Sequence, residues 1–251
     1  MPIQLSLETK KDPTSSLHII NKYETEIVLL VRAYLEAVEA ALRQTEFGNA
    51  TASTMSFDQF LSYMDRLAQK NIMGRTGWVE DMSAQAYSQG RTFSSIILGA
   101  PPEVRAKIWK KTSALITKSD SAFVKMTADI SGDVKRILAD GILKERSQGD
   151  IIKEIQGMSE SSESNARRIV RTETMDAVNI GVMDGYRAEE IERVEWLAAE
   201  GCCDACQALD GKVFDINSGV SAPLHPNCRC TLLPVVDVPG KDIVEAEEWV
   251  E

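Results

Sequence analysis

Residues 202–230 read CCDACQALDGKVFDINSGVSAPLHPNCRC and contain all five cysteines of this 251-residue chain. Within this stretch Cys203 and Cys206 form a Cys-x-x-Cys pair, and His225 and Cys228 form a second pair after an intervening loop. A tetrahedral zinc site uses such pairs, because each pair offers two ligands close together and the loop brings both pairs to one ion. The spacing therefore predicts a zinc site here.

The stretch holds more candidate ligands than a tetrahedral ion needs. The Cys-x-x-Cys pair is the natural first half of the ligand set, which leaves the neighbouring Cys202 spare. The second half comes from His225, Cys228 and Cys230: residues 228 and 230 share a face of an extended strand, whereas His225 and Cys228 suit a turn. We favour His225 with Cys228. The prediction is that zinc is bound by four of five residues, namely Cys203, Cys206, His225, Cys228 and Cys230.

Two other interpretations of these cysteines are weaker. Residues 1–16 read MPIQLSLETKKDPTSS, without the apolar core of a secretory signal, so we expect synthesis in a reducing compartment where clustered cysteines bind metals. An odd number of cysteines also fits a closed disulfide set poorly. A catalytic Cys–His pair would also need a cleft, an oxyanion stabiliser and an orienting group. This interpretation is weaker because closely spaced Cys and His residues favour a metal. The other histidine, His18, is expected on the first helix at the surface or in the core.

Charge and hydropathy narrow the function classes. The net charge of −10 argues against a protein whose whole surface binds nucleic acid, because such binding depends on Lys and Arg neutralising phosphates, so any DNA contact must be local. No stretch approaches the roughly 20 consecutive apolar residues of a membrane span. We therefore predict a soluble protein with no membrane contact. Residues 237–251 read DVPGKDIVEAEEWVE, and we favour a solvated acidic tail. The alternative is a short amphipathic segment that docks on a partner through Val244, Trp249 and Val250.

The sequence pattern of the first 190 residues is typical of helices. Apolar residues recur every three or four positions from Leu17 to Phe47, and Ser56 is a plausible N-cap for a second helix that ends at Met73-Gly74. Further helices are predicted at 76–98, from Pro102 onward, and at about 120–145 and 148–158. We expect an extended arm at 1–16 and an elongated helical bundle at 17–158.

The polar segment 159–164 is either a linker or the capped start of another helix, and we favour the cap, with a helix at 162–190. This helix would carry Arg167, Arg168 and Arg171. One interpretation is a solvated face on which Glu163 pairs with Arg167 at i,i+4 spacing. The other is a local contact with phosphate.

The periodicity changes after residue 190. Strands are predicted at 194–198 and 229–236, and within 209–214 an Asp210-Gly211 turn signal lies just before the extended pair Val213-Phe214. A ribbon-like module of about 45 residues has too small a core to be stable alone, so a metal or packing on the helices must add stability. The predicted fold class is mainly α with a small carboxyl-terminal α+β or β module, in which zinc is structural.

Several motifs in this order are specific in combination. They are Ala166–Thr174 (ARRIVRTET), Val194–Ala199 (VEWLAA), Cys203-x-x-Cys206, Leu209-Asp-Gly211, Val213-Phe214 and Pro223–Leu232 (PLHPNCRCTL). Together they resemble the phage Mu F-like head morphogenesis family of minor capsid proteins, over about residues 145–236. The corresponding region of this chain is 159–236, with the helix at 162–190 and the zinc module at 191–236. Some relatives carry an added toxin or enzyme domain, for which this chain leaves no room after the motifs.

The resemblance implies a protein of the virion, made in the host cytoplasm and located at the portal vertex or in the capsid interior. It would act in head assembly and in DNA packaging or delivery. Its partners would be the portal protein and the major capsid or scaffolding protein, with a possible local contact to packaged DNA. We expect no enzymatic activity. The alternative is a zinc-dependent protein that handles nucleic acid or catalyses hydrolysis.

Overall fold

The computed structural model describes residues 11–44, 56–74, 77–99 and 108–236. The chain divides into two compact units, each built from separate stretches of sequence. Unit 1 contains Met1–Lys22, Val79–Thr117 and Arg171–Glu251, and unit 2 contains Tyr23–Trp78 and Lys118–Val170. The predicted acidic tail at 237–251 and the helix start at Pro102 lie outside the described residues.

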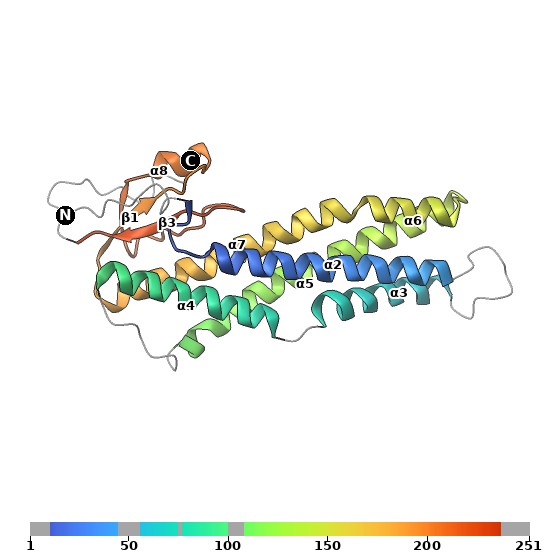
Figure 1. The fold of residues 1–251 in the computed structure, drawn as a ribbon, viewed down its shortest axis with the longest axis horizontal. Coiled ribbons are helices and arrows are strands. Elements are labelled where there is room, and N and C mark those ends of the chain that lie inside the picture. Colours follow the sequence, from blue (N-terminus) through green and yellow to red (C-terminus); the bar gives the residue numbers. More distant parts are fainter. Residues whose placement is uncertain (1–10, 45–55, 75–76, 100–107, 237–251) are drawn as a thin grey trace. The chain divides into compact units, whose positions relative to one another are not determined.

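The described residues form helices followed by a small sheet (Figure 1). The helices are α2 (Leu17–Gln44), α3 (Phe57–Ala68), the π-helix η1 (Gln69–Met73), α4 (Trp78–Leu98), α5 (Ile108–Leu143), α6 (Gln148–Gly157), α7 (Ser159–Ala188) and α8 (Asp204–Leu209). The strands are β1 (Arg193–Leu197), β2 (Val213–Asp215) and β3 (Thr231–Pro234). The predicted fold class, mainly α with a small module near the carboxyl end, is confirmed. No helix in the described ranges has the length and apolar character that crossing a membrane requires.

Unit 2 is a helical bundle whose core follows the predicted spacing. On α2 the buried residues include Ile27, Val31, Tyr34, Val38 and Leu42, which recur at intervals of three and four. Such a stripe occupies one face of a helix, and α3, α5, α6 and α7 contribute buried apolar side chains to the same unit. The start of α3 also agrees with the prediction: Ser56 Oγ accepts the backbone N–H of Gln59 in a capping box.

Two predictions about the helices are wrong. Separate helices were expected before residue 117 and from residue 120, but α5 runs without interruption from Ile108 to Leu143. The polar segment 117–121 (TKSDS) contains neither Gly nor Pro, so it lowers helix propensity without ending the helix. The second difference is α8, a short helix in a region for which only strands and turns were expected.

An ion pair within unit 2 joins α2 to α7. Arg32 Nε and Nη2 donate to the two carboxylate oxygens of Glu163 at 2.7 and 2.8 Å, and Ser159 Oγ donates to the same carboxylate at 3.0 Å. The hydrogen bond from Arg32 is the main reason why the pKa of Glu163 lies below its ordinary value, although partial burial opposes this shift.

This ion pair predicts a pH-dependent effect of Glu163→Gln. A carboxyl group with a lowered pKa in the folded state stabilises the fold above its unfolded pKa of about 4.3, and the stabilisation is lost as the pH falls through the folded pKa. The variant should therefore have a lower urea midpoint than wild type at pH 7, and the difference should disappear as the pH falls through the lowered pKa of Glu163 in the folded state. Glu160→Gln, at an exposed position in the first turn of the same helix, removes only an interaction with the helix dipole and should lower the midpoint at pH 7 less than Glu163→Gln does. A difference that persists at low pH would refute this assignment.

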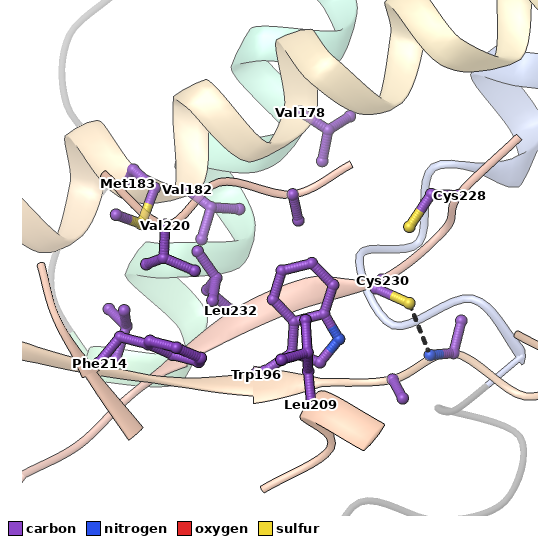
Figure 2. Packing of buried hydrophobic residues seen from close by; sticks show 14 of the residues in the cluster. Val178, Val182, Met183, Trp196, Leu209, Phe214, Val220, Cys228, Cys230 and Leu232 are labelled. Atoms are coloured by element: carbon purple, nitrogen blue, oxygen red, sulfur yellow. Dashed lines mark hydrogen bonds between the residues drawn. The ribbon is translucent and has the colours of Figure 1, made fainter. Parts of the chain in front are cut away.

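Unit 1 contains the sheet, in the order β2-β1-β3 with both pairs antiparallel. Trp196 and Phe214 lie on the buried side and pack against Val178, Val182 and Met183 of α7 (Figure 2). Ala86 and Phe93 of α4 also belong to this core. The small sheet thus does not stand alone, because helical residues of the same unit cover it.

Candidate metal centre

The candidate ligands come from two segments, the start of α8 and the loop between β2 and β3. Cys203 occupies the position before the first residue of α8, and Cys206 lies in the first turn of that helix. On the other side, His225 and Cys228 lie in the loop between β2 and β3, and Cys230 directly precedes β3. The fold therefore brings residues from two separate stretches of sequence, 203–206 and 225–230, close together.

The donor atoms of these residues form two groups of three. The first group is Cys203, Cys206 and His225, and the second is Cys206, Cys228 and Cys230; within each group all donor atoms lie within 4.8 Å of one another. His225 Nε2 lies 3.1 Å from Cys203 Sγ and 3.2 Å from Cys206 Sγ. Cys206 Sγ lies 3.7 Å from Cys228 Sγ. Cys206 belongs to both groups and is the centre of the cluster.

These separations suit a tetrahedral ion. With Zn–S bonds of about 2.3 Å and Zn–N bonds of about 2.0 Å, neighbouring ligand atoms lie roughly 3.5–3.8 Å apart. Of the three distances given above, the S–S distance lies within this range and the two N–S distances lie slightly below it, so small side-chain movements at these atoms would admit an ion. All five cysteines are free thiols. These Cys and His groups could therefore hold a metal ion.

The imidazole of His225 is oriented for coordination. Its Nδ1 lies 2.9 Å from the carbonyl oxygen of Pro226, a contact in which Nδ1 donates its hydrogen. In the neutral ring this places the lone pair on Nε2, the atom that faces Cys203 and Cys206. The backbone therefore selects the tautomer that a metal requires.

Burial and hydrogen bonds between the thiols shift the pKa values of the buried cysteines. Burial, with the nearby Cys228, raises the pKa of Cys206 to about 12. A hydrogen bond from Cys230 lowers the pKa of Cys228 to about 5, against the effect of burial, and the same bond with burial raises the pKa of Cys230. Several adjacent thiolates need a cation to be stable together, because like charges and burial both favour the protonated form.

The surrounding backbone supports the cluster. The N–H of Ala199 donates to Cys230 Sγ at 3.4 Å (Figure 2). Arg229, between two candidate ligands, donates to the carbonyl oxygens of Glu200 at 3.1 Å and Lys11 at 3.5 Å. The loop that carries Cys228 is thus fixed to the segment after β1 and to the start of the described chain.

The structure also places the residues outside the two groups. Cys202 is half-buried, and its Sγ contacts Gln207 Oε1 at 3.8 Å. His18 lies on α2, where its Nδ1 contacts the carbonyl oxygen of Ser15. Each predicted arginine contacts a protein group: Arg167 pairs with Glu24 at 3.6 Å, Arg168 donates to Asn165, and Arg171 donates to Asn227 at 3.4 Å.

Sequence reasoning missed the residues of α7 that contact the loop and strand carrying His225, Cys228 and Cys230. Thr172 Oγ1 accepts the N–H of Asn227 at 3.2 Å, and Asn179 Nδ2 donates to the carbonyl oxygen of Cys230 at 3.2 Å. Tyr186 donates to the carbonyl oxygen of Leu232 at 3.0 Å. The seven-residue spacing of Thr172, Asn179 and Tyr186 was a usable signal, because seven residues are about two helical turns.

A family model described as Phage Mu protein F like protein matches residues 132–233. The match includes all five candidate ligands and α7, and it confirms the resemblance drawn from the sequence motifs. No curated protein and no solved structure matches this chain significantly. Residues 132–233 are therefore similar to the phage Mu F-like family.

Proposed function

From this phage Mu F-like region we propose that the chain is a minor capsid protein of a tailed virus that acts in head morphogenesis. The family suggests a phage head protein, and the region that matches contains the candidate metal centre. The finer role that we propose is at the portal vertex or in the capsid interior, in head assembly and in DNA packaging or delivery.

The proposed metal is one structural zinc ion. The observation that supports it most strongly is the pair of ligand groups that share Cys206, in which Cys206, Cys228 and Cys230 are all buried. Four of the five candidate residues would bind the ion, and His225 with Cys228 stays our preferred second pair. A sheet of three short strands has little stability of its own. An ion that joins the loop before β3 to α8 would therefore stabilise it.

The proposed partners are the portal protein and the major capsid or scaffolding protein of the same virus. The acidic composition of the chain supports protein partners over extensive nucleic-acid contacts, because a net charge of −10 repels phosphate. Contact with packaged DNA would then be local. The chain would be made in the host cytoplasm and incorporated into the virion.

Co-expression with the portal and major capsid proteins tests this proposal. The full chain should co-purify with portal protein, be present in assembled heads, and contain one zinc per chain by elemental analysis. It should show no nuclease or peptidase activity. Absence from both portal and heads would contradict the proposal. Metal-dependent hydrolysis that His225→Ala abolishes, with the fold intact, would instead support the alternative of a zinc-dependent enzyme.

A further inference from the structure

Three polar side chains of α7 contact one continuous segment of the chain, residues 227–232. They are Thr172, Asn179 and Tyr186, which follow one another at intervals of seven residues and so share a face of the helix. Seven residues correspond to an axial rise of about 10.5 Å. The helix therefore presents three hydrogen-bonding groups in a row to the loop and strand that carry Cys228 and Cys230.

The first two contacts lie on either side of a candidate ligand. Thr172 binds the N–H of Asn227, the residue before Cys228, at 3.2 Å. Asn179 binds the carbonyl oxygen of Cys230, two residues after Cys228, at 3.2 Å. The third contact, from Tyr186 to Leu232, lies beyond the ligands in β3. The positions of Cys228 and Cys230 thus depend on the first two contacts more directly than on the third.

Asn179 uses both ends of its amide. Its Nδ2 also donates to the carbonyl oxygen of Met175 at 3.0 Å, and its Oδ1 accepts from Thr231 Oγ1 at 2.7 Å. The side chain is 2% exposed, so water cannot replace these partners. A buried carbonyl group without a hydrogen-bond donor destabilises the fold by about 1–3 kcal/mol. Arrangements of this segment that break the hydrogen bonds of Asn179 are therefore strongly disfavoured.

We propose that Thr172 and Asn179 are positioning residues of the metal centre, which hold the segment 227–231 in the arrangement that binds the ion. Metal ligands that are already in place lose less conformational entropy when the ion binds, so residues that fix them raise affinity without touching the metal. Tyr186 stabilises the same strand but fixes no ligand. This inference rests on the proposed zinc centre.

The test is the zinc dissociation constant of the full chain, measured by competition with a chromophoric chelator. Asn179→Ala should raise it by about 10–100-fold, and Thr172→Val, at a half-buried position, by about tenfold. Thr172→Ser keeps the hydroxyl and should restore wild-type affinity. Tyr186→Phe is the matched control: it removes one buried hydrogen bond to β3 and should lower the urea midpoint, yet leave the dissociation constant within about twofold of wild type.

A spectroscopic measurement separates positioning from general stability. With Co²⁺ in place of zinc, Asn179→Ala should alter the visible absorption bands, which report ligand geometry, and Tyr186→Phe should leave them unchanged. Wild-type affinity and an unchanged spectrum in Asn179→Ala would overturn the proposal, as would equal loss of affinity in Tyr186→Phe. If Asn179→Ala does not fold, the zinc dissociation constants of Thr172→Val and Thr172→Ser test the proposal instead. Wild-type protein that binds no zinc would refute the proposed zinc centre itself, a result distinct from these.

Discussion

Cys206→Ser is expected to abolish zinc binding and unfold the sheet region, whereas Cys202→Ser is expected to be nearly silent. Cys206 is completely buried and belongs to both ligand groups, so every plausible ligand set contains it. A serine hydroxyl is a poor replacement for a thiolate. Structural zinc contributes roughly 10–16 kcal/mol of apparent binding free energy in zinc-finger peptides, which is as large as the whole stability of a typical domain.

The measurements are zinc content and urea unfolding monitored by the fluorescence of Trp196, which packs beside the ligands (Figure 2). Because the fold contains other tryptophans, circular dichroism in the aromatic region should accompany it. Excess EDTA added to wild type should reproduce the effect of Cys206→Ser. Cys203→Ser should also unfold this region. Equal effects at positions 202, 203 and 206 would show that the ligand assignment is wrong.

The parts of the structure that follow from local chemistry could be predicted from the sequence. The spacing of Ile27, Val31, Tyr34 and Val38 places them on one face whatever packs against them. The capping box at Ser56 depends on residues three positions apart. The paired spacing of the candidate ligands likewise restricts where an ion could bind, and the structure places these residues in two groups of three that share Cys206.

What could not be predicted depends on contacts between distant residues. Asn179 and Thr231 are far apart in sequence, and nothing in the neighbourhood of either specifies that their side chains meet at 2.7 Å. Helix α8 is too short to show an amphipathic pattern, so its existence depends on the turn that presents Cys203 and Cys206. The same limit applies to the arginines of α7, whose partners include Glu24 and Asn227.

The second large effect concerns two helical segments of unit 1, which approach each other at glycines. A Cβ atom added to Gly90 of α4 would lie 1.9 Å from the carbonyl oxygen of Val178 on α7. The contact is reciprocal, because a Cβ added to Gly181 of α7 would lie 2.3 Å from the carbonyl oxygen of Tyr87 on α4. Backbone therefore packs directly against backbone, and neither obstacle is the flexible end of a side chain that could move aside.

Gly90→Ala should consequently destabilise the protein by about 3 kcal/mol, since the two segments must separate to admit one methyl group. Helix propensity acts in the opposite direction and favours alanine by about 0.5–1 kcal/mol, so the steric cost must exceed that gain. Gly132→Ala on α5 isolates the propensity effect, because its added Cβ meets no atom within 4 Å, and this variant should be stabilised.

Urea unfolding measures the change in the free energy of unfolding in Gly90→Ala and Gly132→Ala. A stabilised Gly90→Ala would refute the close approach of α4 and α7 in unit 1. The expected loss should also reach the sheet, because Ala86 and Phe93 of α4 and Val178 and Val182 of α7 belong to the cluster that contains Trp196. Separation of the two segments would open that cluster, so Gly90→Ala should also weaken zinc retention, although the glycine lies on a helix that supplies no metal ligand.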